Sequence, residues 1–184
     1  MNAKRVVLDP GHGGQETGIS YEGVLEKDVN LAICLKLRDE LVAAGVEVVM
    51  TREADADLAA ARRIEIANGA NADLHIEWHC DSLEDETVTG VSLWVDPSAN
   101  DVVQRKIDFD VIGDVISETT GQIMMGVYEE KDQVLAQVEV PAVLIRCGFL
   151  SNREERARLI DPVFQQEQAR GAAQGILYLL SPKK

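Results

Sequence analysis

The chain has 184 residues and a formal net charge of −14, with 46% hydrophobic and 27% charged residues. These values are typical of one soluble globular domain with a sizeable core. The excess of acidic residues argues against nucleic-acid binding, which needs a basic surface. No apolar run approaches the roughly 18 residues of a membrane span. We therefore expect no nucleic-acid partner and no membrane span.

The apolar pattern predicts strands alternating with helices along the chain. In chain order we expect a strand at 4–8, a Gly-rich loop at 10–23, a helix at 26–44, a strand at 46–50, a helix at 58–68, strands at 74–79 and 88–95, a helix at 100–119, a strand at 142–147, and helices at 153–160 and 163–180. Residues 121–137 show no clear pattern. The alternation indicates one α/β domain over residues 1–184, with a mostly parallel, twisted central sheet and helices on both faces.

The cysteines and the N-terminus bear on the compartment. Cys34, Cys80 and Cys147 form an odd set without a closely spaced pair, which favours reduced thiols, and the last two are expected to pack at strand ends. The N-terminal residues lead straight into a strand, without the apolar segment and cleavage site of a signal peptide. We therefore expect a cytosolic protein, an excised domain, or export by another route.

Three segments follow predicted strands, at residues 9–14, 79–82 and 146–152. Ligand sites of open α/β sheets lie beyond the carboxyl ends of their strands, so these segments are expected to meet in one crevice. The first contains His12 in the sequence DPGHGG, and the second begins with His79. The acidic residue Glu26 opens the first predicted helix.

Two histidines, a carboxylate and a free fourth position are the ligand set of a known type of catalytic zinc site. The glycines around His12 allow close backbone approach. Zinc would polarise a substrate carbonyl and lower the pKa of its bound water to about 7. Taken singly, each residue also has an ordinary structural explanation: Glu26, for example, could simply be a first-turn carboxylate favoured by the helix dipole.

The residues His12, Glu26 and His79 lie within or beside a set of five longer segments. In chain order these are DPGHGG, EKDVNLAICLKLRDEL, GVEVVMTR, IEWHCDS and VPAVLIRCGFLSN. They resemble the zinc-dependent N-acetylmuramoyl-L-alanine amidases of the amidase-3 type, over nearly the whole chain. The resemblance implies a six-stranded α/β catalytic domain that cleaves the amide bond between the lactyl group of N-acetylmuramic acid and L-alanine. It also implies Zn²⁺ as the cofactor, with His12, Glu26 and His79 as its ligands.

Three positions depart from the family pattern. Arg146 stands where the family has its catalytic glutamate, and an arginine cannot act as a general base because it has no acceptor lone pair. It could instead stabilise an oxyanion. Glu77 stands where the family usually has a small residue, and strand geometry places it on the same face as His79. His75 shares that face, but we expect it about 13 Å from His79, too far to share one metal. Asp81, often asparagine in the family, could be an ordinary loop residue.

Three interpretations of Arg146 and Glu77 are consistent with the sequence. In the first, Glu77 replaces the missing base or supplies an extra carboxylate, with Arg146 as its charge partner, and the enzyme is active. In the second, the two form a structural ion pair in a zinc- and peptidoglycan-binding pseudoenzyme. In the third, Arg146 is an introduced substitution that silences a normal amidase. The first two interpretations predict neighbouring strands and a separation below about 5 Å.

The resemblance also sets expectations for partner and location. Peptidoglycan, as a muramyl peptide, is the expected substrate, and a monomer the expected state. The site of action would be the cell wall, reached either as a phage-type endolysin released from the cytoplasm or as an excised domain of an exported autolysin. A zinc peptidase of another class is disfavoured because the sequence has no HExxH motif.

Overall fold

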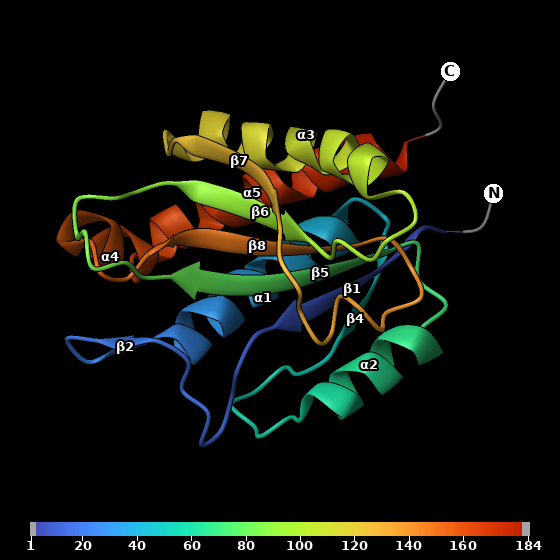
Figure 1. Ribbon diagram of the computed structural model, residues 1–184, viewed down its shortest axis with the longest axis horizontal. Helices are drawn as coiled ribbons and strands as arrows, with labels where there is room; N and C mark the ends of the chain where they lie inside the picture. The colour runs from blue at the N-terminus through green and yellow to red at the C-terminus, as the bar shows by residue number, and fades with distance from the viewer. Residues whose placement is uncertain (1–2, 182–184) are drawn as a thin grey trace.

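The computed structural model describes residues 3–181 and is built on a six-stranded sheet in the order β4-β1-β5-β8-β6-β7 (Figure 1). The strands of this sheet are β1 (Arg5–Pro10), β4 (Glu47–Met50), β5 (Leu74–Asp81), β6 (Val91–Val95), β7 (Met124–Glu129) and β8 (Ala142–Phe149). Two further strands, β2 (Ser20–Tyr21) and β3 (Val24–Leu25), pair in a small antiparallel hairpin. The helices are α1 (Glu26–Ala43), α2 (Ala60–Gly69), α3 (Val102–Thr120), α4 (Arg153–Leu159) and α5 (Pro162–Leu180).

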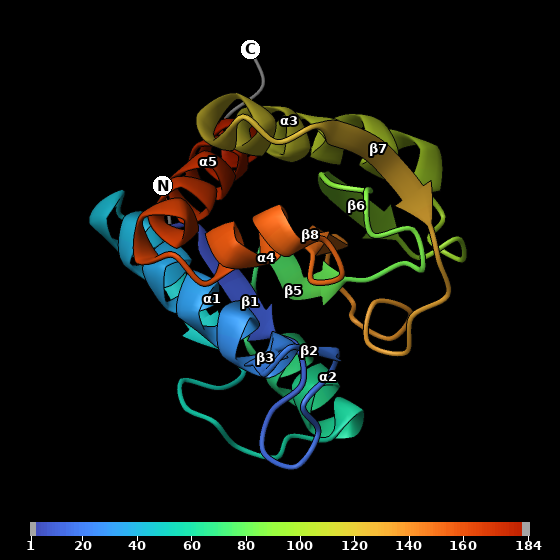
Figure 2. The same cartoon turned by 90° about the vertical axis from the view of Figure 1, so that its left-hand side faces the viewer.

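The main sheet is parallel except at one pair. β4, β1, β5 and β8 run parallel to one another, and β6 pairs with β8 in the antiparallel sense while running parallel to β7. Helices cover both faces, as Figure 2 shows. The predicted α/β fold with a mostly parallel sheet of about six strands is therefore confirmed.

The two faces of the sheet carry different cores. The larger core packs under α1, α3, α4 and α5, and it takes Leu74, Ile76 and Trp78 of β5. The smaller core lies under α2 and the segment 134–138. Since successive residues of a strand point to opposite faces, the intervening polar residues of β5 lie on the α2 face. This face therefore combines a small apolar core with the polar residues of the site.

Some elements differ from the predicted ones. β7 occupies part of the segment 121–137 that showed no pattern, because this edge strand is largely half-exposed and contains Gly126. The β2–β3 hairpin lies inside the predicted Gly-rich loop, where strands of two residues give no periodic signal. Cys80 and Cys147 are buried and unbridged, with their sulfur atoms 3.8 Å apart. Across residues 3–181, no helix has the length and hydropathy that spanning a bilayer demands.

Candidate metal centre

The candidate ligands His12, Glu26 and His79 meet at the carboxyl ends of β1 and β5. Nε2 of His12 lies 3.1 Å from Oε2 of Glu26, and Nδ1 of His79 lies 2.8 Å from Oε1 of the same carboxylate. One ligand atom from each residue can be chosen so that all lie within 4.8 Å of one another. The two imidazole rings stand edge to face, with centroids 4.9 Å apart. Glu26 is therefore the shared partner of both histidines.

Glu26 is held rigidly at the start of α1. Its side chain is 2% exposed, and its two oxygens accept backbone N–H groups of Ile19 at 2.8 Å and Cys80 at 3.0 Å. Burial by itself raises the pKa of this carboxyl, but the hydrogen bonds to His12 and His79 outweigh burial and hold the pKa of Glu26 well below its ordinary value. The site thus offers an ionised carboxylate between two imidazoles.

The backbone around His12 is held by two buried arginines. Arg63 donates to the carbonyl oxygens of His12 at 2.7 Å and Pro10 at 2.9 Å. Arg52 donates to the carbonyls of Pro10 and Gly11, each at 2.9 Å. His12 itself has a φ of 60°, a left-handed conformation that is uncommon outside glycine. The arginines therefore stabilise a strained backbone that presents His12 to Glu26.

Each histidine has a second carboxylate on its outer ring nitrogen. Nε2 of His79 lies 3.1 Å from Oε1 of Glu77, and Nδ1 of His12 lies 3.1 Å from Oε1 of Glu16. Burial alone lowers the pKa of His79, but the hydrogen bonds to Glu26 and Glu77 outweigh it and raise the pKa to about 10. Carboxylates in such places orient metal-binding histidines and fix their tautomers. Glu16 was not predicted, because a Gly-rich loop has no period that would place it.

The packing around the three ligand residues and their donor atoms bear on which ion they could hold. A Cβ atom on Gly18 would lie 2.5 Å from Oε2 of Glu26 and 2.8 Å from Nε2 of His12, and one on Gly11 would overlap the His79 ring. Both glycines therefore let the backbone approach the ligand side chains more closely than any other residue would allow. The donor set, two imidazoles and a carboxylate, suits Zn²⁺. The residues present thus fit a zinc ion.

Glu77 is buried deeply beside this centre. It is 4% exposed, and burial raises the pKa of its carboxyl to about 6 even though the hydrogen bond to His79 opposes the rise. As predicted, it shares the sheet face of His79. Its contact is with the ring of His79, on the nitrogen that faces away from Glu26.

Arg146 lies on β8 directly opposite His79 of β5. Its guanidinium lies 2.6 Å from Oε2 of Glu130 and 3.4 Å from Oδ2 of Asp81, and it stacks 4.3 Å from the ring centroid of Trp94. The side chain is 23% exposed. Arg146 is thus a partly hydrated cation at the rim of the site.

The predicted ion pair between Glu77 and Arg146 is wrong. Their strands are neighbours, as the prediction required, but the register places Leu144 opposite Glu77. Arg146 lies two residues nearer the strand end and pairs with the acidic groups there. Among residues 3–181, the ion-pair partner of Glu77 is His79. Asp81, predicted as a simple loop residue, is one of the partners of Arg146.

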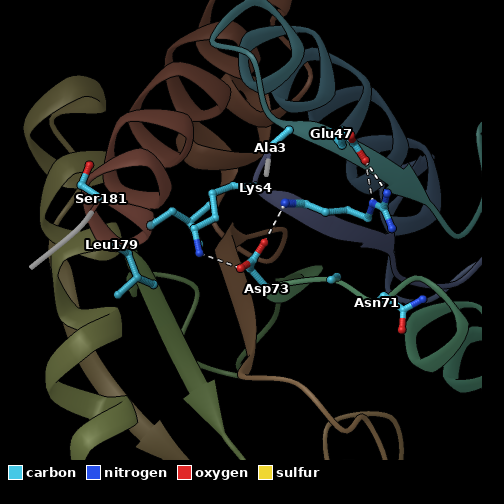
Figure 3. A pocket seen from close by; sticks show the side chains of 10 residues that line it. Ala3, Lys4, Glu47, Asn71, Asp73, Leu179 and Ser181 are labelled. Atoms are coloured by element: carbon cyan, nitrogen blue, oxygen red, sulfur yellow. Dashed lines mark hydrogen bonds and ion pairs between the residues drawn. The ribbon is translucent and has the colours of Figure 1, made fainter. Parts of the chain in front are cut away.

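A pocket of about 620 Å³ opens over the centre and is lined by the three candidate ligands together with Glu77, Asp81 and Arg146. A second cavity, of about 1020 Å³, lies at the opposite end of the strands (Figure 3). There Lys4 pairs with Asp73 at 2.7 Å and Arg5 pairs with Glu47 at 2.5 Å. Because its charges neutralise one another, the second cavity offers no comparable chemistry. The segments at 9–14, 79–82 and 146–152 therefore converge on one crevice, as predicted.

Comparison with known proteins defines the class. A family model described as N-acetylmuramoyl-L-alanine amidase matches residues 6–178, and the chain belongs to this family. It is 30% identical to the germination-specific N-acetylmuramoyl-L-alanine amidase of Bacillus subtilis (strain 168), over 100% of this chain and 82% of the relative. It is 32% identical to the endolysin of Bacillus phage SPP1, over 99% of this chain and 68% of the relative.

The fold agrees with that assignment. The N-acetylmuramoyl-L-alanine amidase from Clostridium difficile 630 superposes with a TM-score of 0.92 at 32% identity, over 98% of each chain. The family is one of hydrolases that degrade the bacterial cell wall, and both host amidases and phage endolysins are among the relatives.

Proposed function

We propose that this chain hydrolyses the amide bond between N-acetylmuramic acid and the L-alanine of the stem peptide, with zinc as the cofactor. The observation that carries the proposal is the His12–Glu26–His79 arrangement, held in a 620 Å³ pocket of an amidase-family fold. Zinc bound by these residues would polarise the scissile carbonyl and lower the pKa of water. The proposed site of action is the cell wall, and the proposed working form is a monomer.

The residues that surround the candidate ligands hold them in position before a metal binds. Glu26 accepts two backbone N–H groups, and the carbonyls of the His12 loop are held by Arg52 and Arg63. Ligands fixed in this way need little reorganisation when the metal binds, which favours both affinity and a single geometry.

Glu77 has two candidate roles, and its contact with His79 favours one of them. We propose that Glu77 is a positioning residue that accepts a hydrogen bond from Nε2 of His79, leaving Nδ1 for the metal. The competing role, predicted from sequence, is that of general base. Glu77→Gln separates them, because an amide oxygen still accepts from His79 but cannot take a proton.

For the positioning role we expect Glu77→Gln to keep zinc affinity and kcat within about 10-fold of the unmodified chain. Glu77→Ala should lower zinc affinity by about 10- to 100-fold. If Glu77→Gln binds zinc normally and yet has lost turnover by about 10²- to 10⁴-fold, the general-base role is correct instead.

Arg146 supplies a fixed positive charge at the pocket rim. We propose that it stabilises the negative charge that develops on the scissile carbonyl oxygen. Its stacking on Trp94 fixes the guanidinium, and its partner Glu130 is 44% exposed and can exchange with substrate groups. Arg146→Lys should lower kcat, because the planar fork and the stacking are both lost.

The deciding experiment incubates the zinc-loaded chain with purified peptidoglycan and quantifies newly freed L-alanine amino groups. We expect release that stops when a chelator removes the zinc and returns when zinc is restored. A specific observation favours a second function, binding without cleavage, because Arg146 occupies the position of the family's glutamate. No release by the unmodified chain, together with co-sedimentation on peptidoglycan and release by Arg146→Glu, would establish that second function.

A further inference from the structure

A second group of ionisable side chains lies deeper on the same face of the sheet. Asp9 of β1 pairs in register with Glu77 of β5, and His75 precedes Glu77 by two residues, so all three share the α2 face. Asp9 and His75 are each 0% exposed, and Glu77 is 4% exposed. One ligand atom from each residue can be chosen so that all lie within 4.8 Å of one another. These residues, here called the Asp9–His75–Glu77 cluster, include none of the three candidate zinc ligands.

The cluster has unpaired polar atoms. In residues 3–181, six buried side-chain N or O atoms have no hydrogen-bond partner, and four belong to this cluster: Oδ2 of Asp9, Oε2 of Glu77, and both ring nitrogens of His75. A buried polar atom without a partner is strongly unfavourable, so such atoms rarely gather in one place. Both nitrogens of a fully buried histidine are free to bind a further group.

The negative charges in and around the cluster are only partly balanced by positive ones. Oδ1 of Asp9 pairs with Arg63 and accepts from Thr51, which accounts for one carboxylate. Glu77 has no lysine or arginine partner within the described part of the chain, where His79 alone pairs with it. Asp132, on the segment before β8, adds a further negative charge that acts on both His75 and Glu77. A divalent cation would balance this excess of negative charge.

We propose that Asp9, His75 and Glu77 form a second metal site, which takes a divalent first-row transition ion such as Zn²⁺ or Mn²⁺. The proposed ligand atoms are the unpaired oxygens of the two carboxylates and one ring nitrogen of His75. An imidazole with two carboxylates suits such ions, whereas Mg²⁺ and Ca²⁺ prefer all-oxygen sites. The ion would reach the cluster through the pocket, because Glu77 lines it.

Glu77 connects this site to the first one. Its Oε1 contacts His79, and its Oε2 belongs to the Asp9–His75–Glu77 cluster. Metal on Oε2 would hold the carboxylate in the rotamer that orients His79. Occupancy of the second site should therefore raise the zinc affinity of the first site, and by linkage the reverse also holds.

The test counts metal ions. The full chain is stripped with a chelator, reloaded with Zn²⁺, passed through gel filtration, and analysed by inductively coupled plasma mass spectrometry. We expect two zinc ions per unmodified chain, one for His75→Phe, one for His12→Ala, and none for the double variant. Phenylalanine is similar in shape to imidazole and has no ligand atom, and the cross-strand neighbours of His75 are Val7 and Ala142, so His75→Phe should fold, which circular dichroism and thermal melting verify.

A titration with Co²⁺, followed by its visible absorption, counts the sites by an independent signal. Two endpoints, the second of them lost in His75→Phe, support the second site. One zinc ion per unmodified chain, or two that persist in His75→Phe, would overturn it. A count of one would mean that protons or water satisfy the cluster, and the first site would be unaffected by that result.

Discussion

His12, Glu26 and His79 lie beside the Asp9–His75–Glu77 cluster, and the two groups have similar chemistry but opposite hydrogen bonding. In the first group both oxygens of Glu26 are paired with histidine and backbone N–H groups. In the second, four polar atoms have no partner in the described chain. A metal site that is preorganised by hydrogen bonds can thus lie next to one that would be completed only by its ion.

The largest effect is expected from removing the carboxylate that both histidines share. Glu26→Ala should lower zinc affinity by more than the roughly 10- to 100-fold that is typical of outer-shell partners, because Glu26 is a proposed ligand. Isothermal titration calorimetry measures this. Asp28→Ala is the matched control, since Asp28 is exposed in the same first helical turn. Equal losses in the two variants would contradict the assignment of Glu26.

Arg63 supports both groups, because it pairs with Asp9 and holds the carbonyl of His12. Arg63→Ala should lower the free energy of unfolding by about 3–5 kcal/mol, since it leaves a buried carboxylate uncompensated. Urea denaturation measures the change. Arg62→Ala is the control: that side chain is 56% exposed, its partner is Glu65, and about 0–1 kcal/mol is expected. A loss below about 1 kcal/mol in Arg63→Ala would contradict the role of Arg63 as the charge partner of Asp9.

Gly18→Ala tests the close packing of the backbone against His12 and Glu26. The added Cβ would meet Glu26 and His12, so zinc affinity should fall by about 10- to 100-fold, as when a supporting contact is lost. Gly23→Ala is the control, because Gly23 also has a positive φ, of 83°, and a Cβ there meets no atom within 4 Å. An equal loss of zinc affinity in the two variants, relative to the unmodified chain, would show that backbone strain at the glycine lowers the affinity, and not the contact of the added Cβ with Glu26 and His12.

The smallest effect is expected at Glu16, the carboxylate on the outer nitrogen of His12. Its side chain is 71% exposed, whereas that of Glu77, which holds His79 in the same way, is 6% exposed. Because solvent screens exposed pairs, Glu16→Ala should change zinc affinity by only a few-fold. A competition assay with a chromophoric chelator can resolve this difference. A loss as large as that of Glu77→Ala would show that exposure does not govern these contacts.

The sequence predicted what depends on local pattern. His12, Glu26 and His79 were found because they stand at strand ends and at a helix start, and chain order alone brings such positions together in an α/β sheet. Strand alternation also placed Glu77 on the face of His79. The assignment of these residues as zinc ligands and catalytic groups stays a prediction until a metal and an activity are measured.

The sequence could not predict what depends on register and on loops. Arg146 pairs with Glu130, which lies just beyond an edge strand that showed no pattern, so this contact had no signal along the chain. His75 was set aside because it lies too far along β5 to share a metal with His79. The pattern along β5 carries no information about β1, whose register brings Asp9 beside Glu77 and creates the Asp9–His75–Glu77 cluster.

The way His12 and Glu26 are held has a consequence for engineering. His12 is held at the end of β1 by arginine side chains, and Glu26 is the first residue of α1. The loop contacts to these two ligands come from Glu16, Gly18 and Ile19, all of which precede the β2–β3 hairpin. At the hairpin tip, a Cβ atom on Gly23 would meet no other atom within 4 Å, so the space beside Gly23 is open, whereas the preceding Glu22 pairs with Arg156. Peptides grafted at this tip should leave the metal geometry intact, which makes the hairpin a place to vary substrate range or attach a wall-targeting tag.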